Sequence, residues 1–151
     1  MKNLVNLSMT SKRIIIYTDG GSRGNPGPAA AGFIVAGRPY GEFLGKATNN
    51  EAEYKAIIFA LKKAKQILGG ERSSQAELEV RSDSSLIVEQ LSGSYKILEP
   101  KLQSLFLEAW NSKLDFKKVI FKQIPREKNN EADRLVNQTL DNSSSHQTNL
   151  F

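Results

Sequence analysis

The stretch RIIIYTDGG, residues 13–21, decides the fold because it joins a strand-like segment to a glycine-rich loop. After Arg13 its residues up to 18 are all β-branched or aromatic, a composition that favours a buried strand. Asp19 follows directly and precedes two glycines. Because open α/β sheets bind ligands at the carboxyl ends of their strands, Asp19 is a candidate site residue. An aspartate that merely opens a turn before glycine is an equally good interpretation.

The residues after this loop predict two more strands and a long helix. Residues 29–36 and 40–46 flank the turn Gly37-Arg38-Pro39 and form a hairpin pair, so three antiparallel strands come first. Residues 49–68 are rich in Ala, Lys, Glu and Leu and end at two glycines, which predicts a helix with a glycine stop.

The second half of the chain contains more helices and two single strands. The strands are predicted at 77–82 and 117–124, and the helices at 84–91, 100–111 and 129–140. The order β-β-β-α-β-α-α-β-α predicts one α/β domain over residues 12–141, with a mixed sheet flanked by helices. The polar ends, residues 1–11 and 142–151, are expected to be flexible tails.

The composition excludes several classes of enzyme. The chain of 151 residues has no cysteine, so it has no disulfide, no catalytic thiol and no cysteine zinc site. Its only histidine, His146, lies in the predicted tail, which argues against a Ser-His-Asp site. No apolar run near the amino end is long enough for a membrane span or a signal peptide. We therefore expect a cytoplasmic monomer with no membrane partner.

The charge balance favours a polyanionic partner. The chain has 21 basic and 16 acidic residues, which gives a net charge of +5. Basic side chains neutralise phosphates, so this excess is typical of proteins that bind nucleic acid. Many basic proteins bind none, and the charge alone is a weak signal.

Two carboxylates fall on predicted apolar stripes of helices. By helical spacing, Glu53 lies on the same face as Ile57 and the apolar residues that follow it at this spacing. Asp133 lies on the same face as Val136 and Leu140. A charge on the buried side of a helix is costly unless it has a partner or a metal, so both residues are expected to face inward and to be functional. The alternative for Glu53 is an exposed place in the first helical turn, where the helix dipole tolerates it.

Asp83 follows predicted strand 77–82 in the way that Asp19 follows residues 13–18, although it could equally cap the helix that begins at Ser84. Two carboxylates at strand ends and two on helices can converge on one crevice, where mutual repulsion raises their pKa values. Mg²⁺ or Mn²⁺ would be a suitable counter-charge, because both prefer carboxylate and water oxygens.

Four segments together resemble the motif blocks of type 1 ribonuclease H. They are YTDGGSRGNPGP at 17–28, TNNEAE at 48–53, SDS at 82–84 and NEAD at 130–133. The segment TDGG alone is a weak signal, whereas TDGGSxGNPGP followed by TNNxxE at the head of a long helix is highly specific. The resemblance covers about residues 13–141.

The resemblance implies a ribonuclease H-like fold, with a five-stranded mixed sheet of three antiparallel strands followed by parallel strands. It also implies an endoribonuclease that cleaves the RNA strand of RNA/DNA hybrids and leaves 5′-phosphate and 3′-hydroxyl ends. Two Mg²⁺ ions, or Mn²⁺ as a substitute, would act in each site. The implied catalytic and metal-binding residues are Asp19, which would bridge both ions, Glu53 and Asp83 on the attacking side, and Asp133 at the other ion.

The resemblance also carries over substrate contacts. The residues expected to line the minor groove of the hybrid, where amides can recognise 2′-hydroxyls, are Gly20, Ser22, Asn49 and Asn50. The residues expected to bind a phosphate of the DNA strand are Asn25, Thr48 and Lys46. Without the motif context, turn and cap roles would be preferred for the asparagines, and a solvated strand end for the lysine.

Two features depart from the family pattern. Many members have a histidine before the last helix that helps proton movement and product release, but residues 125–130 here are PREKNN. Arg126, Glu127 or water would have to substitute for it. Many bacterial members also carry a longer basic helix and loop that binds the DNA strand, where this chain has only residues 92–99.

Three other interpretations stay open at this point. The chain could be a catalytically silent hybrid binder, another nuclease of the superfamily such as a junction resolvase or transposase core, or a non-enzymatic interaction module. The presence of all four carboxylates argues against the silent binder. The asparagines expected to recognise 2′-hydroxyls argue against a nuclease for DNA alone, and inward-facing Glu53 and Asp133 would have no use in an interaction module.

The end of the chain carries a separate motif. Residues 147–151, QTNLF, resemble the pentapeptides by which bacterial replication and repair proteins dock on the sliding clamp. The expected contacts are Leu150 and Phe151 in an apolar pocket and the Gln147 amide at its edge. A pentapeptide is a weak signal, and an unstructured end is the equally good alternative.

Overall fold

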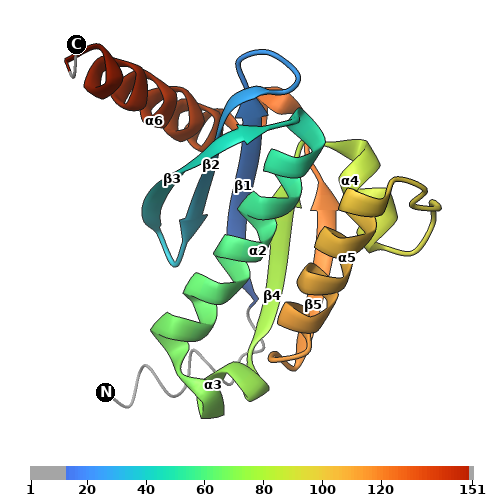
Figure 1. The fold of residues 1–151 in the computed structure, drawn as a ribbon. Helices are drawn as coiled ribbons and strands as arrows, with labels where there is room; N and C mark the ends of the chain where they lie inside the picture. Colours follow the sequence, from blue (N-terminus) through green and yellow to red (C-terminus); the bar gives the residue numbers. More distant parts are fainter. Residues whose placement is uncertain (1–12, 150–151) are drawn as a thin grey trace.

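The computed structural model describes residues 13–149 and contains one five-stranded mixed sheet of order β3-β2-β1-β4-β5. The first three strands pair antiparallel, and β4 and β5 then join β1 in parallel. This is the predicted sheet (Figure 1). The strands are β1 (Ile14–Ser22), β2 (Gly27–Val35), β3 (Arg38–Ala47), β4 (Glu77–Ser82) and β5 (Lys118–Gln123).

Helices cover both faces of this sheet. The helices α2 and α5 pack against each other on one face, whereas α6 packs across β1, β2 and β3 on the other face and runs outward past the β3 edge (Figure 1). The helical elements are α2 (Asn49–Leu68), α3 (Gly70–Gln75), α4 (Ser85–Leu91), α5 (Pro100–Lys113), the 3-10 turn η1 (Arg126–Lys128) and α6 (Asn130–Asn149).

The main core lies between α2 and the sheet. The predicted apolar stripe of α2 is confirmed, because Ile57, Ala60 and Ala64 are all buried there. The helix begins with a capping box, in which the Thr48 hydroxyl accepts the Glu51 N–H and the Glu51 carboxylate accepts the Thr48 N–H. This cap fixes the start of α2 beside the carboxyl end of β1, because it satisfies backbone N–H groups that have no partner within the helix.

Two α-helices of the described structure differ from the prediction. The helix α3 was not predicted, because its six residues GERSSQ carry no apolar periodicity. The last helix was expected to end near Leu140, but α6 continues to Asn149. Leu140 is its last buried apolar residue, so the periodicity stops there, whereas residues 141–149 contain no glycine or proline that would end the helix.

The ends of the chain bear on two further expectations. The predicted amino-terminal tail, residues 1–11, lies outside the described residues, and the flexibility of both tails stays a prediction. Within the part of the chain that is described, no helix has the length and apolar character needed to cross a membrane.

Candidate active site

Three of the four predicted carboxylates meet at the carboxyl ends of β1 and β4. Asp19 lies on β1, Asp83 comes directly after β4, and Glu53 lies in the second turn of α2. Each offers an oxygen atom, and these oxygens lie within 4.8 Å of one another. Since β1 and β4 pair in parallel, their carboxyl ends reach the same edge of the sheet. The predicted convergence of these three residues is confirmed.

Gly20 allows α2 to come close enough to join this cluster. A Cβ atom at Gly20 would overlap the backbone of Ala52 and Glu53, so only glycine fits between β1 and α2 here. On the other face, a Cβ atom at Gly32 would lie 2.5 Å from the carbonyl oxygen of Ala132 on α6. The two helices that carry site carboxylates therefore approach the sheet at glycine positions.

The environment of the cluster raises the pKa of two of its carboxyls. Burial, followed by the charges of Asp83 and Asp133, raises the pKa of Asp19 to about 8. Burial, followed by the charges of Asp19 and Asp83, raises the pKa of Glu53 well above its usual range, while the positive charge of Arg126 lowers it. Without a cation the cluster therefore retains protons at neutral pH, because crowded carboxylates in a buried place cannot all ionise.

Glu53 has a polar atom that the described residues leave unsatisfied. Its Oε1 atom is buried and has no hydrogen-bond partner among them. An unpaired buried carboxylate oxygen is destabilising. A divalent cation that prefers oxygen ligands would satisfy this atom, so the donor set fits Mg²⁺ or Mn²⁺.

Asp133 lies at the rim of the cluster, and one expectation about it was wrong. It was predicted to face the buried side of its helix, but its side chain is exposed. The buried stripe of α6 runs through Ala132, Val136 and Leu140, and Asp133 lies beside this stripe in the first turn. It still lines the same cleft as Asp19 and Glu53, and its charge contributes to the raised pKa of Asp19.

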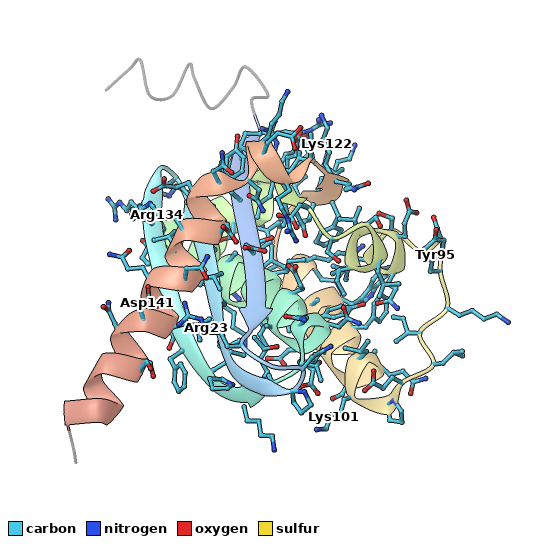
Figure 2. The ribbon with its side chains drawn as sticks, turned by 90° about the horizontal axis from the view of Figure 1, so that it is seen from above. Arg23, Tyr95, Lys101, Lys122, Arg134 and Asp141 are labelled. Carbon is cyan, nitrogen blue, oxygen red and sulfur yellow. The ribbon has the colours of Figure 1, made fainter. Side chains whose placement is uncertain are left out.

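The cleft has a volume of about 350 Å³, and cations stand among the residues that line it. Arg23 comes from the loop between β1 and β2, and Arg126 comes from η1. The Arg23 Nη2 atom lies 2.8 Å from Asp141 Oδ1 on α6 (Figure 2). Glu127, the other predicted auxiliary residue, is exposed and is not among the described residues that line the cleft.

The predicted minor-groove residues divide into two groups. Gly20, Ser22 and Asn49 line the cleft, and Asn49 Oδ1 accepts hydrogen bonds from the Ser22 backbone N–H at 2.9 Å and from its hydroxyl at 3.2 Å. These bonds join the β1 loop to the start of α2. Asn50, the next residue in the first turn of α2, is half-buried. It is not among the described residues that line the cleft.

The predicted phosphate-pocket residues hold the start of α2. Asn25 Oδ1 accepts the Asn49 N–H at 2.9 Å, and Thr48 is the N-cap residue of α2. Lys46 is exposed at the end of β3, where it is paired with Pro28 of β2. The contact of Asn25 agrees with the cap role considered for the asparagines, the N-cap role of Thr48 was not predicted, and the role of all three residues in phosphate binding stays a prediction.

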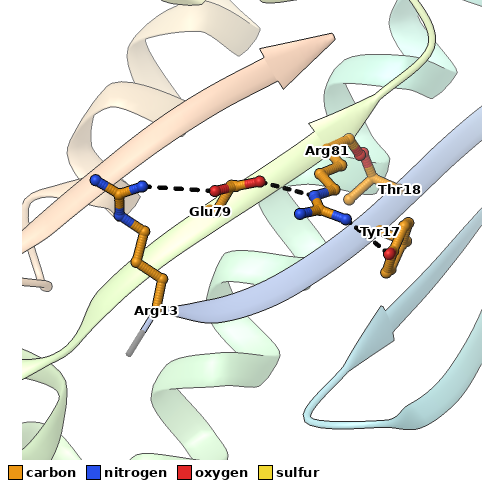
Figure 3. Close-up of polar contacts among 5 residues, drawn as sticks. All are labelled: Arg13, Tyr17, Thr18, Glu79 and Arg81. Atoms are coloured by element: carbon orange, nitrogen blue, oxygen red, sulfur yellow. Dashed lines mark hydrogen bonds and ion pairs between the residues drawn. The ribbon is translucent and has the colours of Figure 1, made fainter. Parts of the chain in front are cut away.

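A chain of ionic contacts fixes β1 against β4 just before the carboxylates. Glu79 is only 6% exposed, and its two oxygens contact Arg13 at 3.6 Å and Arg81 at 2.7 Å (Figure 3). Arg81 also donates to the Tyr17 hydroxyl at 2.8 Å, and the Thr18 hydroxyl donates to the Arg81 carbonyl at 3.0 Å. Because Tyr17 and Arg81 come two residues before Asp19 and Asp83, this chain holds the two carboxylates in register.

Three lining or supporting residues were missed from the sequence. Arg23 is the only cation in the loop motif at 17–28, which was a usable signal. Asn137 lines the cleft and donates a hydrogen bond to the Asp133 carbonyl at 3.2 Å. Asn129 is 1% exposed and donates to Asp83 Oδ2 at 2.9 Å, but an asparagine before a helix is typical of an ordinary cap, so no pattern distinguished it.

The predicted clamp-docking residues cannot be placed in this site. Leu150 and Phe151 lie outside the described residues, and Gln147 belongs to α6. Clamp docking stays a prediction.

Known proteins resemble the chain over most of its length. A family model described as reverse transcriptase-like matches residues 18–139. A ribonuclease HI of Halobacterium salinarum is 36% identical over 137 residues, which are 87% of this chain and 66% of that protein. A bifunctional protein of Mycobacterium tuberculosis is 38% identical over 136 residues, which are 85% of this chain. The chain spans 36% of that mycobacterial relative.

Solved structures resemble the chain equally well. The crystal structure of an LC11 ribonuclease H1 in complex with an RNA/DNA hybrid has a TM-score of 0.81 and 42% identity, and the match covers 87% of this chain and 99% of that one. The structure of the H. salinarum ribonuclease H1 has a TM-score of 0.79 and 36% identity, with coverage of 87% and 99%.

Proposed function

Because the chain belongs to the type 1 ribonuclease H family, we propose that it is an endonuclease that hydrolyses the RNA strand of RNA/DNA hybrids. The observation that carries this proposal is the convergence of Asp19, Glu53 and Asp83 within 4.8 Å beside a cleft. The similarity to a relative solved with a bound hybrid supports the same substrate class.

Mg²⁺, with Mn²⁺ as a substitute, is the proposed cofactor. Two bound ions would supply an activated water for in-line attack and would stabilise the leaving 3′ oxygen, which produces 5′-phosphate and 3′-hydroxyl ends. Asp19, Glu53 and Asp83 would hold the ions together with Asp133. The buried, unpaired Glu53 Oε1 supports this assignment, since ligation satisfies an atom that otherwise has no partner among the described residues.

The chain's own residues would contribute to substrate binding and to the geometry of the site in three ways. The Ser22 and Asn49 side chains stand at the cleft wall, where they can meet 2′-hydroxyls of the RNA strand. Arg23 and Arg126 bring positive charge to a cleft that is otherwise acidic, where they can neutralise phosphates. Gly20 keeps Glu53 close to Asp19 by admitting the α2 backbone.

Arg126 is the better substitute for the histidine that many family members carry in this loop. Arg126 lines the cleft, and its positive charge lowers the pKa of Glu53. Glu127 is not one of the described residues that line the cleft. An arginine does not lose its proton in proteins, so Arg126 would stabilise the charge of the product phosphate and would not carry a proton. Proton transfer would then depend on water and on the carboxyls of the cluster.

The test is cleavage of labelled RNA/DNA, RNA/RNA and DNA/DNA duplexes with Mg²⁺ or Mn²⁺, alongside the Asp19→Asn variant. We expect cleavage of the RNA strand of the hybrid and no cleavage of DNA/DNA, and no cleavage by the variant. Hybrid binding without cleavage under either metal would support a silent binder. Cleavage of DNA/DNA would support a different nuclease of the superfamily, and each of these results would overturn the proposal.

A further inference from the structure

Asn129 is a buried residue that contacts the carboxylate cluster from outside it. It lies between η1 and α6, and its side chain is 1% exposed. The Nδ2 amide donates one hydrogen bond to Asp83 Oδ2 and another to the Thr18 carbonyl, both at 2.9 Å. Thr18 immediately precedes Asp19, so this one side chain contacts the segments that carry two of the converging carboxylates.

The backbone of Asn129 contacts a third carboxylate-bearing segment. Its carbonyl accepts the N–H of Asp133 at 3.1 Å, and its N–H donates to the Arg126 carbonyl at 2.9 Å. Asn129 therefore connects the end of β1, the residue after β4 and the first turn of α6.

The two partners of the amide decide its orientation. Both Asp83 Oδ2 and the Thr18 carbonyl are acceptors, so the NH₂ group of Asn129 must face them and its oxygen must face away. The Asn129 Oδ1 atom is buried and has no hydrogen-bond partner in the described part of the chain. In this orientation the side chain donates two hydrogen bonds, and its own oxygen accepts none from the described residues.

We propose that Asn129 is a positioning residue, which holds the Asp83 carboxylate in the orientation that a divalent cation requires. This inference rests on the proposed metal-dependent function. The donated bond limits rotation of the Asp83 carboxylate and keeps it beside Asp19 and Glu53 when no cation is bound. Residues that orient metal ligands typically contribute about 10-fold to 100-fold to metal affinity or activity.

Asn129→Ala and Tyr54→Phe form a matched pair of variants for the test. Asn129→Ala removes two side-chain hydrogen bonds and Tyr54→Phe removes one, since the Tyr54 hydroxyl donates to Gln90 Oε1 at 2.7 Å between α2 and α4. Both are expected to lower the Tm. Only Asn129→Ala should raise the Mg²⁺ concentration for half-saturation, by about 10-fold or more, and lower kcat, while KM for the hybrid stays within about twofold. Half-saturation is measured without substrate, from the rise of Tm with Mg²⁺.

A double-variant cycle shows whether Asn129 acts through Asp83. If it does, Asn129→Ala should weaken Mg²⁺ binding in the wild-type background but add no further loss in an Asp83→Ala background. Equal losses in both backgrounds would mean that Asn129 acts on the fold in general, and would overturn the proposal. The same conclusion would follow if Tyr54→Phe shifted the Mg²⁺ half-saturation as much as Asn129→Ala.

A measurement on the wild-type chain keeps the proposal testable if Asn129→Ala fails to fold. The side-chain NH₂ signals of Asn129 should exchange slowly with solvent in NMR spectra and should shift on addition of Mg²⁺. Fast exchange, or signals that do not move with Mg²⁺ although other cluster signals do, would overturn the positioning role. If no signal of the protein responds to Mg²⁺ and no hybrid is cleaved, the proposed function itself has failed, which is a distinguishable result.

Discussion

Asp19 and Glu53 present carboxylate oxygens within 4.8 Å of each other, although one lies on β1 and the other on α2. Burial is the main reason that the pKa of each is raised, and the charge of Asp19 raises the pKa of Glu53 further. The pair is therefore held together against its own repulsion by the folding of two separate elements. That arrangement links protonation, cation binding and stability.

Asp19→Asn should abolish cleavage and yet stabilise the protein at pH 8 without Mg²⁺. The pKa of Asp19 is raised from 3.8 to about 8, so between these values the folded protein holds a proton that the unfolded chain releases. Stability should therefore fall as pH rises through this window, and asparagine removes that loss. Urea unfolding in EDTA should show a gain of at least about 1 kcal/mol at pH 8 and little gain at pH 4. A variant less stable than wild type at pH 8 would contradict the assignment.

Cation binding at pH 7 should release protons. Most of the metal-free protein holds the Asp19 proton at this pH, and a bound divalent cation displaces it, so at least about one proton per protein should appear on saturation with Mg²⁺, and Glu53 can add to this release. Isothermal titration calorimetry in two buffers of different ionisation enthalpy measures this release. Asp19→Asn serves as the control and should release fewer protons. A binding heat that does not depend on the buffer at pH 7 would argue against a raised pKa.

Asp133→Asn should reduce cleavage less than Asp19→Asn does. Asp133 is exposed at the rim of the cleft, and it is not one of the three residues whose oxygens converge within 4.8 Å. We expect a loss of about 10-fold to 100-fold and a higher Mg²⁺ requirement. Its removal should also lower the pKa of Asp19, whose raised value depends partly on the Asp133 charge. The comparison is kcat against Mg²⁺ concentration for both variants, and equal losses would place Asp133 among the converging ligands instead.

The strands and the place of Glu53 could be predicted because they depend on local periodicity. The β-branched run before Asp19 indicates a strand in any context, and the spacing from Glu53 to Ile57 places this carboxylate on a buried stripe. The parallel pairing of β1 and β4 then brings Asp83 to the same edge as Asp19. For these residues, sequence pattern and topology lead to the same site.

The exposure of Asp133 and the contacts of Asn129 could not be predicted in the same way. Periodicity states which face of α6 is apolar, but not whether a residue beside that face, such as Asp133, faces the sheet or the open cleft. Asn129 is connected to Asp83 over 46 positions of sequence, and no local pattern records such a contact. The continuation of α6 beyond Leu140 was missed for a related reason, because a helix without apolar residues has no periodic signal.

Arg23→Ala should weaken hybrid binding without changing the chemical step. Arg23 lines the cleft and is held by Asp141 Oδ1 and, at 3.4 Å, by the Asn137 carbonyl, but it does not touch the carboxylate cluster in any described contact. We expect a higher KM, an unchanged kcat at saturating hybrid, and a salt dependence of affinity that is shallower by about 0.9. Asp141→Asn is the control, because it frees the cation without removing it and should keep the salt slope. A fall in kcat alone would place Arg23 in the chemical step.

Gly20→Ala should damage both stability and cation binding, and Gly21→Ala provides the matched control. A methyl group at Gly20 would overlap the backbone of Ala52 and Glu53, and backbone atoms cannot move aside by rotating a side chain. The helix α2 must then shift away from β1, which carries Glu53 away from Asp19. A methyl group at Gly21 would meet only Val136 Cγ1, at 3.6 Å, an ordinary van der Waals contact.

We expect Gly20→Ala to lower the free energy of unfolding by about 2 kcal/mol or more, since overpacking against rigid atoms is strongly destabilising, and to abolish the stabilisation by Mg²⁺. Gly21→Ala should leave both close to the wild-type values. Urea unfolding with and without Mg²⁺ measures the two quantities in one experiment. Gly20→Ala could lower the free energy of unfolding and still be stabilised by Mg²⁺ as much as the wild type is. That result would show that Glu53 is not needed for cation binding, and that the close approach of α2 matters only for packing of the core. Equal behaviour of the two variants would show that the space beside Gly20 is not limiting.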